Sequence, residues 1–205
     1  GFGVSASSLG MTDASFTSLE EIVRITSNIV RAVDIPVMTD ADTGYGNAVN
    51  VWWTTKRLEE TGAAGMNLED QCFPKRCGHM AGKQLISLGE MVGKIRAAVD
   101  AKRDPDFVIN ARTDAAYVCG IEEAIRRGNA YLEAGADMVF VESPASAEEV
   151  KRAIEQIKGP VSINMLEGGR TPMLTFEELR QLGAARVSCP MFTSLIAAYA
   201  LQKGL

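Results

Sequence analysis

Short apolar runs alternate with longer amphipathic stretches from one end of the chain to the other. Each run is bounded by Gly, Pro or Asp, which is typical of strands buried within a parallel sheet. The six runs lie at residues 35–38, 64–68, 107–111, 138–141, 161–165 and 185–189. Helical periodicity separates them, so the pattern predicts six strand–helix units and an α/β fold with a parallel sheet.

The amphipathic stretches carry start and stop signals for helices. Four of them begin with Ser or Thr followed three residues later by Glu, which is the spacing of a capping box. The capping residues are Ser18, Ser87, Ser146 and Thr175. Glycines that can adopt a left-handed conformation follow three helical stretches, at Gly62, Gly135 and Gly183.

Polar groups stand at the carboxyl end of nearly every apolar run. They are Asp40 and Asp42, Glu69 and Asp70, Arg112 and Asp114, Glu142, and Asn164. Such a ring lies where (β/α)8 barrels keep their active sites. An open doubly wound sheet would favour a glycine-rich phosphate loop, and no such motif follows a run here. We therefore favour a (β/α)8 TIM-type barrel, with an open six-unit sheet as the alternative.

The length of 205 residues suits one domain with a sizeable core. We interpret residues 1–205 as a single barrel domain. Because a barrel of this type has eight strands and only six runs are visible, we expect two further strands before Gly1.

Charge and composition exclude several classes of partner. A net charge of −5 and a pI near 5.1 argue against nucleic acid and anionic membranes. No apolar stretch is long enough to span a membrane, and the first residues lack the features of a signal peptide. Four irregularly spaced cysteines do not form a disulfide framework, so we expect reduced thiols and a cytoplasmic protein.

The acids after the first two runs could bind a metal ion. Asp40 and Asp42 alternate at a strand end and can point the same way. With Glu69 and Asp70 they offer the all-oxygen surroundings that suit Mg²⁺ or Mn²⁺ rather than zinc. The alternative is that these acids cap helices or pair with Arg and Lys.

A second candidate is the segment Lys75-Arg76-Cys77-Gly78-His79, which contains the one histidine of the chain. Flanking cations favour a thiolate, which acts as a nucleophile or shuttles a proton. Cys72, Cys77 and His79 do not have the spacing of a structural zinc site, and a basic surface loop is the other alternative. We interpret the remaining cysteines, Cys72, Cys119 and Cys189, as packing residues.

Arg112 is a third candidate, because a guanidinium can bind a carboxylate through two parallel hydrogen bonds. Its structural alternative is an ion pair with Asp114, Glu142 or Asp70, and the two roles are compatible.

Several of these motifs occur together and in order. They are residues 40–46 (DADTGYG), 62–65 (GAAG), 69–71 (EDQ), 75–79 (KRCGH), 112–114 (RTD) and 164–169 (NMLEGG). This set resembles the isocitrate lyase/phosphoenolpyruvate mutase superfamily over essentially the entire chain. Within it, the cysteine-bearing segment resembles the carbon–carbon lyase branch.

The resemblance implies roles for individual residues. The metal would be Mg²⁺, with Mn²⁺ as the alternative, held by Asp40, Asp42, Glu69 and Asp13. Gly1, Phe2 and Gly3 match a loop after the second barrel strand whose backbone amides hold the pyruvate carboxylate. Arg112 matches the arginine that grips the pyruvyl part. Cys77 is expected to be the catalytic acid. The expected cations that offset developing charge are Lys75, Arg76 and His79. The residues expected to line the substrate pocket are Gly78, Glu142 and Asn164.

The implied activity is a Mg²⁺-dependent retro-aldol (Claisen-type) cleavage of a 2-hydroxy-2-methyl di- or tricarboxylate. Substrates of the 2-methylisocitrate or 2,3-dimethylmalate type would yield pyruvate plus succinate or propionate. The alternatives are hydrolysis of oxaloacetate to oxalate and acetate, and a non-catalytic barrel that binds a metal or carboxylate. The resemblance also implies further helices after Leu205, so we expect the barrel domain to be incomplete at both ends. It implies in addition a homotetramer in which C-terminal helices are exchanged between subunits.

Overall fold

A computed structural model describes residues 1–78 and 80–205. Its centre is a sheet of six parallel strands, each paired with the next one along the chain. The strands are β1 (Met38–Asp40), β2 (Gly65–Glu69), β3 (Val108–Thr113), β4 (Met138–Val141), β5 (Val161–Asn164) and β6 (Arg186–Ser188). The predicted α/β class, the parallel sheet and the six strand–helix units are confirmed.

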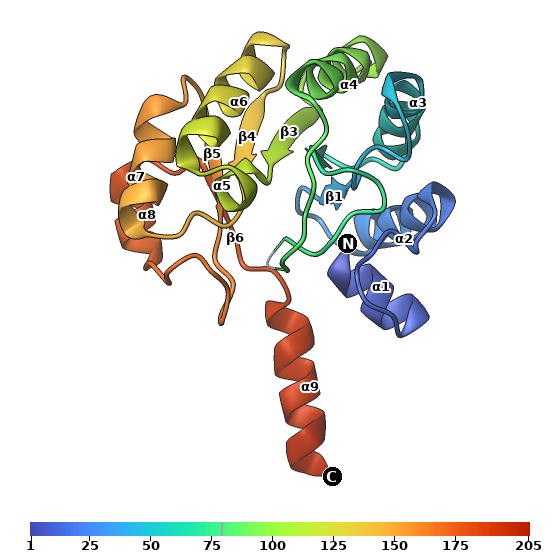
Figure 1. The fold of residues 1–205 in the computed structure, drawn as a ribbon. Helices are drawn as coiled ribbons and strands as arrows, with labels where there is room; N and C mark the ends of the chain where they lie inside the picture. The colour runs from blue at the N-terminus through green and yellow to red at the C-terminus, as the bar shows by residue number, and fades with distance from the viewer. Residues whose placement is uncertain (79) are drawn as a thin grey trace.

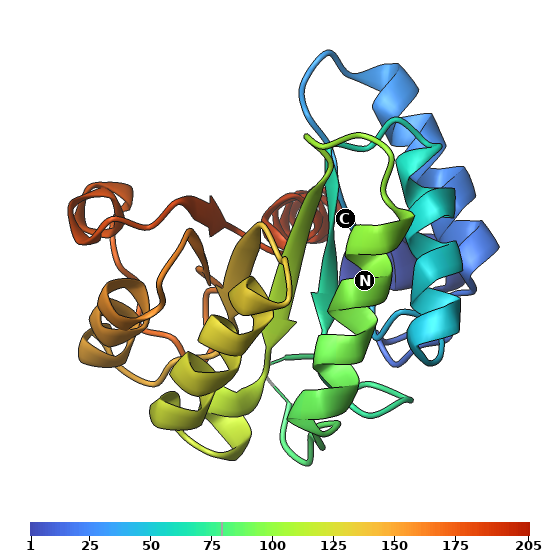
Figure 2. The same ribbon diagram turned by 90° about the horizontal axis from the view of Figure 1, so that it is seen from above.

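Helices surround the outer face of this sheet, which curls into part of a barrel (Figures 1 and 2). The helices are α1 (Phe2–Leu9), α2 (Leu19–Ala32), α3 (Ala48–Glu59), α4 (Leu88–Ala101), α5 (Ala115–Val118), α6 (Ile121–Glu133), α7 (Ala147–Gln156), α8 (Phe176–Leu182) and α9 (Phe192–Gly204). The arrangement is consistent with a TIM-type fold, and β1 and β6 form the two edges of the described sheet.

The first strand begins later than the apolar run predicts. The run covers residues 35–38, whereas β1 starts at Met38. Pro36 has no N–H to donate to a neighbouring strand, and Ile35 is 71% exposed. The ladder begins where the carbonyl of Val37 accepts a hydrogen bond from the backbone N–H of Ala64 (2.8 Å).

The predicted helix ends are confirmed. Ser18 and Thr175 form complete capping boxes with Glu21 and Glu178. Ser87 and Ser146 accept a hydrogen bond from the expected backbone N–H groups without the reciprocal bond. The three glycines that follow helical stretches have φ values of 81°, 103° and 91°, at Gly62, Gly135 and Gly183.

Alternation along the strands separates a hydrophobic layer from a polar interior. In β2, Met66 and Leu68 are fully buried in the core between sheet and helices. Asn67 and Glu69, on the opposite face, line a cavity inside the curve of the sheet. The same strands therefore stabilise the fold with one face and build a site with the other.

The last helix, α9, projects away from the body of the molecule (Figure 1). It has no buried residue, and its apolar side chains Phe192, Ile196, Tyr199 and Leu201 are exposed. Among the described helices, none combines the length and hydrophobicity needed to cross a membrane.

Candidate active site

A cavity of 290 Å³ opens at the carboxyl ends of the strands, where the polar ring was predicted. Every strand contributes to its wall. The contributions are Met38 and Asp40 from β1, Asn67 and Glu69 from β2, Arg112 from β3, Phe140 from β4, Asn164 from β5, and Arg186 and Ser188 from β6. Asp13, Asp42, Lys75, Cys77, Gly78 and Glu142 complete the wall together with a few apolar residues.

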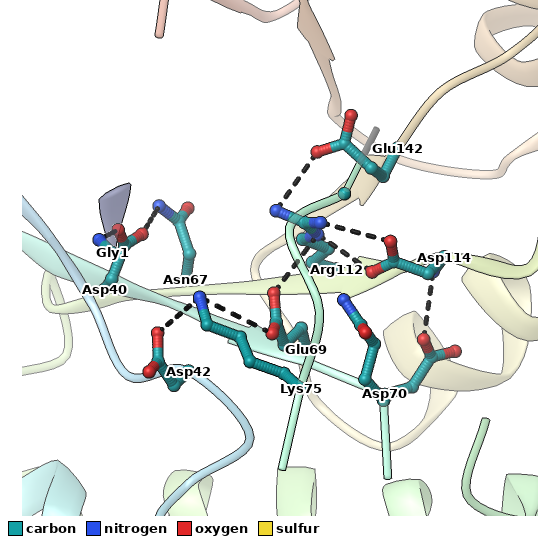
Figure 3. A network of polar contacts seen from close by, with 12 residues as sticks. Gly1, Asp40, Asp42, Asn67, Glu69, Asp70, Lys75, Arg112, Asp114 and Glu142 are labelled. Carbon is teal, nitrogen blue, oxygen red and sulfur yellow. Dashed lines mark hydrogen bonds and ion pairs between the residues drawn. The ribbon is translucent and has the colours of Figure 1, made fainter. Parts of the chain in front are cut away.

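The acids on one side of the cavity gather around Lys75 (Figure 3). The Nζ atom of Lys75 lies 2.8 Å from Asp42 Oδ1, 3.0 Å from Asp13 Oδ2 and 3.8 Å from Glu69 Oε1. Asp40 stands beside them, accepts a hydrogen bond from Asn67 Nδ2 (3.0 Å) and forms an ion pair with the amino group of Gly1. The structure therefore brings together all four acids expected to hold a metal.

Burial changes the ionisation of this cluster. It raises the pKa of Glu69 to about 7, against the opposing pull of Lys75 and Arg112. Burial alone would lower the pKa of Lys75, but Glu69, Asp42 and Asp13 outweigh it and raise that pKa. Lys75 therefore stays charged, and it is neutralised by its neighbours rather than free to stabilise a substrate anion.

A second cluster surrounds Arg112. Its Nε and Nη2 atoms donate to the two carboxylate oxygens of Asp114 at 2.9 and 3.1 Å. Nη1 lies 3.0 Å from Glu142 Oε2, and Nε lies 3.3 Å from Glu69 Oε2. Burial opposes the charge of Arg112, but these carboxylates raise its pKa well above the ordinary value. Arg112 is thus ion-paired and lines the cavity at once, so the two predicted roles coexist.

Asp70 does not belong to the site, contrary to the grouping of acids by sequence. It faces the helices, where it accepts hydrogen bonds from Tyr131 Oη (2.6 Å), Arg127 Nη1 (3.0 Å) and Thr113 Oγ1 (2.8 Å). It also accepts one from the backbone N–H of Asp114 (2.9 Å). Consecutive strand residues point to opposite faces, so Glu69 and Asp70 cannot both face the cavity.

The segment after β2 carries Cys77 and Gly78 to the cavity wall. A Cβ atom on Gly78 would lie 2.3 Å from Arg112 Nη2 and 2.8 Å from the carboxyl carbon of Glu142. Only glycine lets the backbone approach these two side chains so closely. His79 lies outside the described residues, so its expected role as a cation and any zinc site that includes it rest on the sequence.

Arg76 does not face the cavity in this structure, and its expected role beside the substrate stays a prediction. Its side chain is exposed and reaches the carbonyl of Ala81 (3.5 Å). Its backbone is held by Gln71 through hydrogen bonds of 2.9 and 3.0 Å. Lys75 points inward and Arg76 outward, because neighbouring side chains in an extended segment alternate.

The expected N-terminal loop is helical. Gly1 caps α1, and Phe2 and Gly3 form its first turn instead of an extended loop. Phe2 lines the cavity, whereas Gly3 is exposed and takes no part in the wall. Gly1 contacts the site through its amino group, which pairs with Asp40.

Some residues of the site had not been singled out in the sequence. Asn67 donates to Asp40 and accepts a hydrogen bond from Asn110 Nδ2 (2.8 Å). Its alternation with Glu69 in β2 is a signal that could have found it. Ser188 donates to Asn164 Oδ1 (2.7 Å), and Asn164 Nδ2 in turn approaches Glu142 Oε2 (3.4 Å).

All four cysteines are free. Cys72 is half-buried, but Cys119 and Cys189 are exposed, so the packing role predicted for those two is wrong. Cys119 follows the short helix α5 and Cys189 follows β6, where no layer covers them. Cys189 lies on the cavity wall.

The donor set of the acid cluster fits a hard cation. Within the described residues, no three His, Cys, Asp or Glu side chains lie close enough to form a metal-binding group. Three buried carboxylate oxygens nevertheless have no hydrogen-bond partner: Asp13 Oδ1, Asp42 Oδ2 and Glu69 Oε1. Buried oxygens without partners are costly unless an ion or ordered water satisfies them. Such oxygens are the donors that Mg²⁺ uses directly or through its waters.

Fold and site together define a barrel-type α/β protein with an acid-rich, arginine-containing site at the carboxyl ends of its strands. The chain belongs to the phosphoenolpyruvate phosphomutase family, which matches residues 1–205. The superfamily membership predicted from the motifs is confirmed.

Relatives with known names fall within the predicted branch. The chain is 54% identical over 183 residues to the 2,3-dimethylmalate lyase of Eubacterium barkeri, covering 89% of this chain and 63% of that protein. It is 42% identical over 203 residues to the 2-methylisocitrate lyase of Shewanella oneidensis, covering 99% and 70%. The solved structure of an oxaloacetate acetylhydrolase with the inhibitor 3,3-difluorooxalacetate matches with a TM-score of 0.95 and 36% identity, covering 99% and 70%. The chain thus spans about two thirds of the length of these relatives.

Proposed function

We propose that this chain forms the barrel part of a carbon–carbon lyase that cleaves a 2-hydroxy-2-methyl di- or tricarboxylate to pyruvate and a second carboxylic acid. The observation that carries the proposal is that one cavity joins a thiol, an arginine and a cluster of incompletely satisfied carboxylates. The curated lyases among the relatives support the same reaction class.

Arg112 binds a carboxylate of the substrate in this proposal. Each terminal guanidinium nitrogen carries two N–H groups, and the described contacts use one on Nη1 and one on Nη2. One N–H on each of these nitrogens is therefore available to a carboxylate of the substrate in this cavity. Asp114 and Glu142 keep the guanidinium oriented before the substrate arrives, which reduces the entropy lost on binding.

Cys77 supplies a proton. Loss of the proton from the 2-hydroxyl forms the pyruvate carbonyl as the bond between C2 and C3 breaks. The electron pair of that bond passes to C3, where the adjacent carboxylate stabilises it. The Sγ–H of Cys77 then delivers a proton to C3 and completes the second acid.

We infer that Mg²⁺, or Mn²⁺ as the alternative, is held by the acids around Lys75: Asp13, Asp40, Asp42 and Glu69. The three unpartnered oxygens of this cluster support the inference. A bound divalent ion supplies positive charge that favours ionisation of the 2-hydroxyl and a template for the substrate. Lys75 limits the repulsion among these carboxylates and keeps them in place.

We further propose that the intact protein is a homotetramer in which C-terminal helices are exchanged between subunits. The exposed apolar side chains of α9 support this assembly, because a helix without buried residues gains stability only by packing on another surface. Light scattering on the full-length protein should give the mass of a tetramer. A monomeric mass would contradict this proposal.

The activity is tested by adding the full-length protein and Mg²⁺ to 2,3-dimethylmalate and to 2-methylisocitrate and measuring pyruvate. We expect pyruvate from at least one of them, with 2,3-dimethylmalate favoured by the 54% identity to its lyase against 42–47% identity to 2-methylisocitrate lyases. The absence of pyruvate from both acids and from a panel of 2-alkylmalates would contradict the proposal.

Oxaloacetate hydrolysis is the second candidate, because the fold matches an oxaloacetate acetylhydrolase with a TM-score of 0.95. The same preparation incubated with oxaloacetate distinguishes the two. Oxalate and acetate as products, with no pyruvate released from the alkylmalates, would favour the hydrolase.

A further inference from the structure

We propose that Lys83 is a positioning residue that couples the cysteine loop (residues 75–78) to Arg112. This inference rests on the proposed function, since it concerns the thiol and the guanidinium to which that function assigns the proton transfer and the carboxylate grip. Lys83 does not line the 290 Å³ cavity, but with Cys77 it lines a neighbouring cavity of 510 Å³. We infer that it acts on the site through Cys77 and Arg112.

Lys83 forms a fully buried ion pair. Its Nζ atom lies 2.7 Å from Asp114 Oδ1, and both side chains are 0% exposed. The ammonium also lies over the ring of Tyr117, 4.6 Å from its centroid. A buried ion pair costs much of its Coulombic gain in desolvation, so apolar side chains of similar size would stabilise this place at least as well. The residues that contact this ion pair indicate a role beyond stability.

Asp114, the acidic member of this ion pair, also binds Arg112. The same carboxylate of Asp114 that accepts from Lys83 accepts two hydrogen bonds from Arg112, at 2.9 and 3.1 Å (Figure 3). The backbone N–H of Asp114 is fixed in turn by Asp70 (2.9 Å). Removing the charge of Lys83 would leave Asp114 with Arg112 as its one cationic partner among the described residues.

Lys83, the basic member of this ion pair, also binds the cysteine loop. The Nζ atom of Lys83 donates to the carbonyl oxygen of Gly78, which also accepts a hydrogen bond from Ser143 Oγ (3.1 Å). This carbonyl lies one residue from Cys77, and its glycine packs against Arg112 and Glu142. A single ammonium thus determines where the thiol and the guanidinium stand relative to each other.

The test uses Lys83→Met in the full-length enzyme with Mg²⁺. We expect kcat to fall by at least about tenfold, as for other residues that do not contact the substrate but orient the residues that do. Without substrate, iodoacetamide should alkylate Cys77 several-fold faster than in the wild type, while the rate at Cys72 stays constant. Alkylation is measured by mass spectrometry of the two peptides, and a general loosening of the fold would raise both rates.

Lys102→Met is the matched control. Lys102 also pairs with an aspartate, Asp137 (3.1 Å), and also donates to a carbonyl, that of Phe107 (3.0 Å). It lies just before β3, at the opposite end of the sheet. We expect its kcat and its Cys77 alkylation rate to match the wild type.

Wild-type kcat together with an unchanged Cys77 alkylation rate in Lys83→Met would overturn the inference. If that variant does not fold, Lys83→Gln removes the charge but keeps a side-chain N–H that can still donate to the Gly78 carbonyl. It should accelerate alkylation of Cys77 to a smaller extent, and an unchanged rate would overturn the inference. If the wild-type protein releases no pyruvate, the proposed function is contradicted. The role of Lys83 is then still tested, because the alkylation experiment needs no turnover.

Discussion

Glu69 and Asp70 are neighbours in sequence and acids of the same kind, yet they occupy opposite regions of the molecule. Asp70 lies between sheet and helices and accepts hydrogen bonds from four donors, two of them on Arg127 and Tyr131 of α6. Glu69 faces the cavity, where Oε1 has no hydrogen-bond partner. Burial raises the pKa of both, and for Glu69 to about 7.

The contrast teaches how to separate a structural acid from a functional one. A buried carboxylate whose oxygens are all satisfied ties elements together, and the fold accounts for it fully. A buried carboxylate that the protein leaves incompletely satisfied awaits a proton, a metal or a ligand.

Asp70→Asn should cost the most stability. The amide cannot pair with the charge of Arg127, which is 7% exposed and keeps Glu123 as a partner (2.9 Å), nor can it accept all four hydrogen bonds. Because Glu123 remains, we expect a loss of about 3 kcal/mol of unfolding free energy, the lower end of the range for broken buried ion pairs. Urea unfolding measures this loss of unfolding free energy. A loss below about 1 kcal/mol would show that Asp70 is not needed to hold the fold together.

Glu69→Gln should change how stability depends on pH. The unfolded carboxyl loses its proton near pH 4.5 and the folded one near pH 7. Between these values the folded state binds more protons, so this group lowers the stability of the metal-free protein as pH rises, by about 3 kcal/mol in total. Above about pH 8, where the folded carboxyl has lost its proton, its contribution is constant.

The measurement compares urea unfolding of wild type and Glu69→Gln in chelator at pH 5 and pH 7.5. The difference in stability between the two proteins should shift in favour of the glutamine variant at the higher pH. If the difference in unfolding free energy between the two proteins is the same at pH 5 and pH 7.5, Glu69 has an ordinary pKa.

Asp42→Asn should weaken Mg²⁺ binding by about 10–100-fold, in the range seen when groups around a metal are altered. Asparagine keeps the size of the side chain and tolerates the left-handed φ of 46° at this position. Calorimetric titration checks the effect, with the exposed residue Asp34 changed to Asn as the control. Equal affinities in the two variants would refute the metal site at this cluster.

Arg76→Ala should have the smallest effect. Its side chain is exposed and lies outside the 290 Å³ cavity, and surface substitutions usually change stability by less than about 0.5 kcal/mol. We expect kcat/KM within about twofold of the wild type, whereas Lys75→Ala should lose most activity. A large loss in Arg76→Ala would support the role that the sequence predicted for it.

The strands, the helix caps and the strand-end acids Asp40, Asp42 and Glu69 could be predicted from the sequence because they follow from local patterns. It could not decide between Glu69 and Asp70, since strands of a parallel sheet are buried on both faces and alternation does not tell which face is the interior. The pairing of Lys83 with Asp114 joins residues 31 positions apart and has no local signature. The first turn of α1 was expected as a loop because the resemblance, not a helical pattern, defined it.

The central claim is that Cys77 provides the proton of a pyruvate-forming cleavage. It is tested most directly by assaying pyruvate release by the full-length Cys77→Ser variant, with Cys72→Ser as the matched control. We expect Cys77→Ser to abolish turnover but still to bind pyruvate and Mg²⁺, while Cys72→Ser keeps wild-type activity. Full activity of Cys77→Ser would contradict it.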